Sequence, residues 1–174
     1  MKIVVLAGGL STERDVSLST GSMVSNALRR KGHQVVLLDV FLGCGKAGDD
    51  ITHLFEVAAG SEIKPISVPD QAASLASVKA MREDPSDCFF GPNVIELCRA
   101  ADIVFLALHG ENGEDGRIQA AFDLFGIRYT GSGYLSSAIA MDKILSKQFF
   151  AAAGVPTPRG ISMKRAERIH DAAK

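Results

Sequence analysis

Two glycine-containing loops of this sequence carry side chains that could face a bound ligand. The first has the sequence AGGLSTERDVS at residues 7–17, and its Glu13 is a carboxylate that could hold the ammonium group of a substrate. The second has the sequence LHGENGEDG at residues 108–116, and its His109 directly follows an apolar run. Both loops are predicted to leave the carboxyl ends of parallel strands, where open α/β sheets bind ligands. We therefore expect Glu13 and His109 to converge on one crevice at this edge of the sheet.

The acidic residues of the two loops also have a purely structural interpretation. Glu13 and Asp15 could simply complement the dipole at the start of a helix, an effect of about 0.3–1 kcal/mol. Asp115 could cap the next helix, and Glu114 could orient His109 through a hydrogen bond. A histidine at the carboxyl end of a strand and directly before a glycine nevertheless favours a position facing a ligand.

A third segment, GSGYLSSAIAMDK at residues 131–143, places glycine and serine residues ahead of a predicted helix. Helix N-termini attract anions because their first backbone N–H groups have no partner within the helix. Lys143 ends this segment, and a lysine on a helix is by itself usually only a solvated charge. The segment is therefore a candidate anion site only in combination with the other two.

The elements that must position these loops begin with a strand at residues 2–7. This run is continuously apolar, which is typical of a central strand in a parallel sheet. Apolar residues at spacings of three and four predict a helix over residues 16–31, with cations in its last turn and Gly32 after it. A second apolar run at residues 34–40 completes a βαβ unit with a right-handed crossover.

The rest of the chain predicts a peripheral excursion and then the remainder of the sheet. The excursion covers residues 41–100 and has helices at 71–82 and 92–100. After it the pattern predicts a strand at 102–108, a helix at 117–125, a short strand at 127–130, helices at 135–141 and 142–153, a strand at 159–163 and the start of a helix at 165–174. A rigid connector, VPTP, lies at residues 155–158.

This order of elements predicts the fold class. We expect an α/β domain over residues 1–154, with an open, mostly parallel sheet and helices on both faces. A linker and the beginning of a second domain would follow over residues 155–174, because connectors of this kind mark domain boundaries.

Composition excludes several classes of protein. The 174 residues are 47% hydrophobic and 22% charged, which is too apolar for a disordered chain and sufficient for a packed core. The net charge of −1 disfavours non-specific nucleic-acid binding. No apolar run could span a membrane, and the N-terminus matches no signal peptide, so we expect a cytoplasmic protein. We expect buried or unreactive thiols at Cys44, Cys88 and Cys98, and surface positions for His33, His53 and His170.

Together, the three segments resemble the D-alanine–D-alanine ligase family. The resemblance rests on AGGLSTERDVS, then LHGENGEDGRIQAAFDLFGI, then YTGSG, AMDKILSK and GVPTP, in that order. It covers residues 2–40 and 101–158 clearly, and residues 41–100 only weakly. It implies a Rossmann-like domain that precedes an ATP-grasp region, and the start of that region near the C-terminus.

The resemblance also implies roles for individual residues. Glu13 corresponds to the acid that holds the ammonium of the first D-alanine, and His109 to the histidine near its reacting carboxylate. Val16 and Ser17 resemble residues that line the same pocket. Lys143 resembles a lysine that reaches the phosphates of ATP.

The implied reaction is an ATP-dependent condensation for peptidoglycan synthesis. The carboxylate of the first D-alanine attacks the γ-phosphate of ATP to form an acyl phosphate, and the amine of a second D-alanine then attacks the acyl carbon. The family implies ATP and Mg2+ as cofactors and a homodimer for the full-length protein. The family's central lysine, phosphate-covering loop, C-terminal arginine and metal ligands have no counterpart in these 174 residues. We therefore expect this polypeptide alone to be inactive and to contain no metal ligand.

Three other interpretations remain open on the sequence alone. Gly8-Gly9 and Asp39 resemble a nicotinamide-binding fold, but GGLSTE does not match G-x-G-x-x-G. LAGGLSTERD resembles the start of a sugar-nucleotide transferase, but such a protein would not explain the LHGENGEDG loop. A non-catalytic binding or regulatory domain is the third. Within the ligases, D-lactate or D-serine could replace the second D-alanine.

Overall fold

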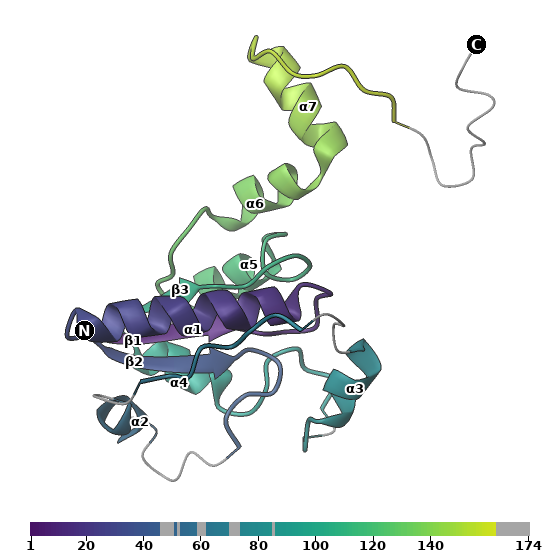
Figure 1. The fold of residues 1–174 in the computed structure, drawn as a ribbon. Helices are drawn as coiled ribbons and strands as arrows, with labels where there is room; N and C mark the ends of the chain where they lie inside the picture. Colours follow the sequence, from purple (N-terminus) through teal and green to yellow (C-terminus); the bar gives the residue numbers. More distant parts are fainter. Residues whose placement is uncertain (46–50, 52, 59–61, 70–73, 85, 163–174) are drawn as a thin grey trace.

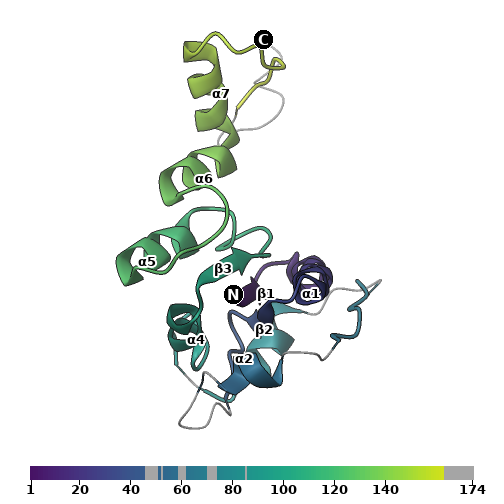
Figure 2. The ribbon, with the colours of Figure 1, turned by 90° about the vertical axis from the view of Figure 1, so that its left-hand side faces the viewer.

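A computed structural model describes residues 1–45, 51, 53–58, 62–69, 74–84 and 86–162. Its centre is a three-stranded parallel sheet in the order β2-β1-β3 (Figures 1 and 2). The strands are β1 (Lys2–Ala7), β2 (Gln34–Asp39) and β3 (Ile103–Leu106). The parallel sheet of the predicted fold class is confirmed, and β1 lies at its centre as its continuous apolar run indicated.

Helices cover both faces of the sheet, as predicted. In chain order, the helices of the described residues are α1 (Arg14–Arg30), α2 (His53–Val57), α3 (Leu75–Ala80), α4 (Val94–Ala100), α5 (Arg117–Phe125), α6 (Tyr134–Met141) and α7 (Lys143–Ala152). Of these, α1 covers one face of the sheet, and α2, α4 and α5 cover the other. Alternate side chains of β1 point to opposite faces of the sheet. Ile3, Val5 and Ala7 pack with α1, whereas Val4 and Leu6 join the larger cluster beneath α2, α4 and α5.

Several predicted elements end elsewhere in the structure. The strand expected at 102–108 is shorter, and α4 begins two residues later than the predicted 92. Residues 127–130 form only a single bridge, Val104 to Tyr129, rather than a strand. Residues 159–162 have no regular structure. The first part of the predicted helix at 71–82, residue 163 and the predicted helix at 165–174 lie outside the described residues.

The helices α6 and α7 extend away from the sheet (Figures 1 and 2). We call residues Tyr134–Ala152 the α6–α7 arm. Its large apolar side chains other than Ile139 are exposed, among them Leu135 at 60% and Phe149 at 56%. The arm is apolar enough to be buried but has little of the sheet to pack against.

No helix in the described part of the chain is long and apolar enough to cross a membrane.

Candidate functional site

The first loop leaves β1 through two glycines with positive φ, Gly8 at +76° and Gly9 at +87°. This left-handed backbone reverses the chain at little cost only for glycine. The hydroxyl of Ser17, on α1, accepts a hydrogen bond from the Gly8 N–H at 2.9 Å and donates one to the Ala107 carbonyl at 2.7 Å. Ser17 is fully buried. Its hydroxyl therefore ties the end of β1 to the segment that follows β3.

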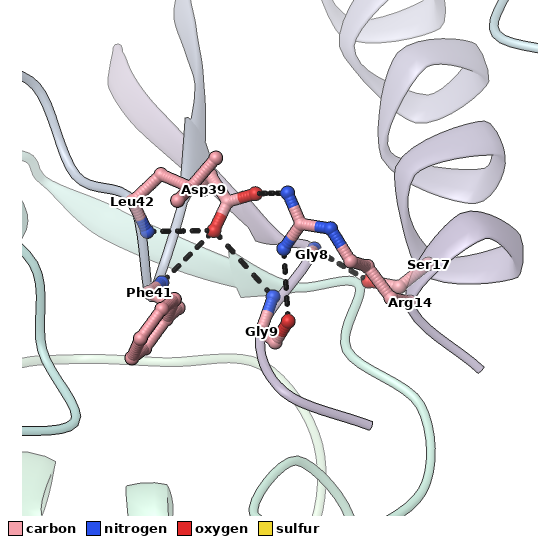
Figure 3. Close-up of polar contacts among 7 residues, drawn as sticks. All are labelled: Gly8, Gly9, Arg14, Ser17, Asp39, Phe41 and Leu42. Carbon is pink, nitrogen blue, oxygen red and sulfur yellow. Dashed lines mark hydrogen bonds and ion pairs between the residues drawn. The ribbon is translucent and has the colours of Figure 1, made fainter. Parts of the chain in front are cut away.

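A largely buried ion pair supports the same loop from the side of β2 (Figure 3). The Arg14 guanidinium pairs with the Asp39 carboxylate and also donates to the Gly9 carbonyl at 2.8 Å. The other carboxylate oxygen of Asp39 accepts from the N–H groups of Phe41 at 2.9 Å, Leu42 at 3.0 Å and Gly9 at 3.5 Å. We call Arg14, Asp39 and the Gly9 backbone the Arg14–Asp39 clamp.

The clamp bears on the nicotinamide interpretation of Asp39. In a dinucleotide fold the acid after the second strand hydrogen-bonds a ribose hydroxyl. Here both oxygens of that carboxylate are engaged by protein donors. A Cβ atom added to Gly8 would also overlap this carboxylate. Asp39 therefore braces the loop and is not presented to a ligand.

The second loop folds on itself through its own polar side chains. Glu114 accepts from the Gly110 N–H at 2.8 Å, and Asp115 accepts from the N–H of Asn112 at 3.0 Å and of Arg117 at 3.2 Å. The buried Gln119 donates to the Gly113 carbonyl at 2.8 Å. These bonds use Glu114, Asp115 and Gln119 to fix the shape of the loop that follows His109.

The two loops meet at Gly110. A Cβ atom placed there would lie 2.6 Å from Oε2 of Glu13, and Gly110 has φ +72°. The backbone conformation favours glycine here, and any larger side chain would also displace the Glu13 carboxylate. The structure brings the exposed Glu13 side chain against the loop that carries His109, at the carboxyl ends of β1 and β3.

His109 is a third exposed and lies between α1 and its own loop. Its Nε2 is 3.3 Å from the hydroxyl of Thr20. Its Nδ1 is 4.0 Å from Oε1 of Glu114, which is too long for a hydrogen bond. The hydrogen bond that Glu114 could accept from His109 is therefore absent, and the carboxylate accepts through its other oxygen from the Gly110 N–H.

The remaining candidate residues lie in different surroundings. Val16 is 41% exposed on α1, between Glu13 and Thr20. Ser17 is buried, so its side chain does not line a free surface in this structure.

Lys143 lies apart from the two loops, at the start of α7 in the α6–α7 arm. Its Nζ donates to the Ala140 carbonyl at 2.8 Å. It lines an open hollow of about 620 Å³ together with Lys147 and Arg159. Three cationic side chains on one hollow suit an anionic ligand such as a polyphosphate.

The three thiols, His33 and His53 lie outside the two loops. Cys98 is buried between α4 and the sheet, and desolvation raises the pKa of its thiol to about 12. Cys44 is half-buried, and Cys88 and His53 are exposed. His33 is half-buried, and His170 falls outside the described residues. Among the residues that the structure places, no three His, Cys, Asp or Glu side chains are grouped to hold a metal ion.

Sequence reasoning missed three residues that shape this site: Arg14, Thr20 and Gln119. Arg14 stands among polar loop residues, and only its distance from Asp39 in space identifies its partner. Thr20 falls at the same spacing as the apolar positions of its helix, so the pattern gives no sign of a polar role. For Gln119, a buried amide within an apolar helix face was a usable signal, because buried amides need hydrogen-bond partners.

Comparison with known proteins gives a consistent result. A family model described as "D-ala D-ala ligase N-terminus" matches residues 2–132. The D-alanine–D-alanine ligase of Lacticaseibacillus casei is 47% identical over 165 residues, which cover 95% of this chain and 46% of that protein. The ligase of Pediococcus pentosaceus is 42% identical over 174 residues, covering 98% of this chain and 48% of its own length. The chain thus spans about half the length of these curated relatives.

Solved structures give the same result for the fold. A crystal structure of D-alanine–D-alanine ligase from Bacillus anthracis complexed with ATP is 28% identical, with a TM-score of 0.60, and the match covers 97% of this chain and 42% of that one. The ligase structure from Coxiella burnetii has a TM-score of 0.61 at 23% identity, covering 99% of this chain and 48% of the other, and supports the fold alone.

Proposed function

The chain belongs to the D-alanine–D-alanine ligase family, and from this premise we propose that it forms the part of an ATP-dependent ligase that binds the first D-alanine. Residues 1–154 would be the substrate-binding domain, and residues 155–174 the linker and the start of the ATP-grasp region. The observation that carries the proposal is the contact between the loop of Glu13 and the loop of His109 at Gly110.

The proposed site matches the charges of an amino-acid zwitterion. The Glu13 carboxylate would bind the ammonium group of D-alanine. A pair of opposite unit charges about 4 Å apart attracts by roughly 4 kcal/mol at an effective dielectric of 20, before desolvation is subtracted. His109 would lie near the substrate carboxylate, with Val16 beside the methyl group. Ser17 would act by holding both loops in register.

We propose that ATP binds at the cationic hollow beside α7. Lys143, Lys147 and Arg159 line it, and we propose that Lys143 contacts the phosphates. ATP would supply the phosphoryl group that activates the first D-alanine's carboxylate as an acyl phosphate. This chain's own residues would hold the carboxylate in place for that transfer, which is catalysis by positioning and by charge stabilisation. Mg2+ is implied by the family, and its ligands would lie outside these residues.

The whole protein's properties follow as part of the same proposal. A ligase that makes D-alanyl-D-alanine for peptidoglycan would work in the cytoplasm, where ATP is available, and would form a homodimer, with no role for nucleic acid or a membrane. D-lactate or D-serine remains an alternative acceptor. The 174-residue polypeptide by itself would release no phosphate from ATP in response to D-alanine.

The decisive experiment is a titration of the 15N-labelled chain with D-alanine, followed by the amide signals in NMR. We expect saturable shifts confined to residues 8–17 and 108–116. Glu13→Gln should abolish them, because a neutral amide cannot pair with the ammonium.

Asp15→Asn is the matched control, since Asp15 is the neighbouring acid in the first turn of α1. It should leave the response to D-alanine unchanged. L-Alanine should bind more weakly than D-alanine. Shifts that survive Glu13→Gln, or that appear elsewhere in the chain, would overturn the proposal.

A further inference from the structure

The Thr20 hydroxyl is directed at the imidazole of His109. Thr20 Oγ1 lies 3.3 Å from His109 Nε2, and the two residues are 89 positions apart in the sequence. Both side chains are partly buried. Thr20 follows Val16 along α1 at helical spacing, so these two side chains lie on the same side of the helix that begins directly after Glu13.

A threonine within a helix usually donates its hydroxyl proton to the carbonyl three or four residues earlier. Ser22 on α1 does so, donating to the Ser19 carbonyl at 2.8 Å. Among the described residues, the only polar contact of the Thr20 hydroxyl is the His109 ring. The hydroxyl proton is therefore available to the imidazole.

The other ring nitrogen faces a negative charge. Nδ1 of His109 lies 4.0 Å from the Glu114 carboxylate, which can only accept hydrogen bonds when ionised. A proton on Nδ1 is favoured by this carboxylate, and it leaves Nε2 as an acceptor for Thr20. In a neutral imidazole one nitrogen donates and the other accepts, so the two neighbours select the same tautomer.

We propose that Thr20 is a positioning residue that donates to Nε2 of neutral His109 and holds it in the Nδ1–H tautomer. Glu114, which the sequence suggested as a direct hydrogen-bond partner, would act at longer range through its charge. The proposal deepens the function proposed above by naming the group that orients the substrate-facing histidine, and its consequence for D-alanine rests on that function.

The test is the tautomer itself, measured by long-range 1H–15N correlation in the 174-residue chain labelled on histidine, at a pH where the imidazole is neutral. His109→Gln identifies the signal by its loss. We expect a pyridine-type Nε2 and a pyrrole-type Nδ1 in the unmodified chain. Thr20→Val keeps the branched shape without the hydroxyl and should shift the population towards Nε2–H. Thr20→Ser should restore the original pattern.

Ser19→Ala is the matched control, because it removes a neighbouring hydroxyl on the same helix without touching His109. It should change nothing, and the signals of His33 and His53 should stay constant in every variant. An Nε2–H tautomer in the unmodified chain, or a Thr20→Val chain with an unchanged His109 signal, would overturn the proposal. The backbone amide spectrum of each variant verifies that it folds.

A D-alanine titration of the same variants separates this proposal from the function on which it builds. Thr20→Val should weaken D-alanine binding about 2- to 10-fold, as the loss of one neutral hydrogen bond does. If the tautomer responds as expected but no form of the chain binds D-alanine, the proposed function fails and the assignment of Thr20 stands.

Discussion

The sheet region and the α6–α7 arm both contain apolar residues, but they differ in how far these residues are buried. Val4, Val5 and Leu6 of β1 have no exposed surface, whereas Leu135 and Phe149 of the arm keep more than half of theirs. A parallel strand is covered on both faces by its own crossover helices. The arm lacks such a cover, since it extends beyond the sheet (Figure 2). An apolar segment is thus expected to pack against another surface. Whether this chain itself supplies that surface depends on the fold.

The largest difference between the regions is expected when one phenylalanine in each is replaced by alanine and the loss in the free energy of unfolding is compared. Phe122 on α5 is fully buried, and Phe149 on α7 is 56% exposed. Phe122→Ala should lower the free energy of unfolding by about 3–5 kcal/mol, because it leaves a cavity in the core. Phe149→Ala should change it by no more than about 0.5 kcal/mol. Urea denaturation measures both, and equal effects would show that the arm is as tightly packed as the sheet.

The next comparison is between two aspartates, one in each region. Asp39 and Asp142 make the same local hydrogen bonds. Each accepts, through one oxygen, from the N–H groups two and three residues later, at 2.9 and 3.0 Å. Only Asp39 also pairs with a buried arginine. Asp39→Ala should cost about 3 kcal/mol, because it leaves Arg14 without its partner charge.

Asp142→Ala should cost at most about 1 kcal/mol, the effect of losing a helix cap. Circular dichroism would detect its loss of helix in the arm, and thermal unfolding would measure both variants. Similar losses for the two would mean that the Arg14–Asp39 clamp adds nothing to the local turn.

The smallest difference is expected for two glycines with nearly the same backbone. Gly8 has φ +76° and Gly154 has φ +70°, but only at Gly8 would a Cβ atom meet another side chain. Gly154→Ala should cost about 1 kcal/mol for the left-handed conformation alone. Gly8→Ala should cost about 2 kcal/mol, because the methyl group must also displace Asp39. Chemical denaturation of the two variants measures both losses in stability, and their difference is the steric effect of the methyl group. Identical losses would contradict the close approach of Asp39 to Gly8.

Regular elements with clear ends were predictable from the sequence. The bounds of β1 and α5 are those predicted, because an apolar run before Gly8-Gly9 and an amphipathic stretch between Gly116 and Gly126 mark them. The helix α2 was missed, since five residues are too few for a period to show. It is held by Phe55, whose side chain is fully buried against the sheet. At residues 127–130 the apolar pattern overestimated the pairing, which is limited to one bridge.

The candidate site was predictable in its residue types and only partly in its geometry. Glu13 and His109 follow strands whose carboxyl ends share an edge, and this places their loops near each other on any parallel sheet. The partner of the His109 ring was not predictable. Glu114 is close in sequence, but its carboxylate is used by the Gly110 backbone, and Thr20 from another element contacts the ring instead.

The amino-acid sequence alone determined the parallel α/β core, the glycine turns and the membership of a ligase family, because each depends on residue types at short, regular spacings. Only the tertiary structure decided that Arg14 braces Asp39, that Ser17 joins Gly8 to Ala107, and that Thr20 contacts His109. These partners are 25, 9 or about 90 residues apart. A hydrogen bond forms only when its atoms come within about 3 Å, and that approach depends on how the whole sheet and its helices pack.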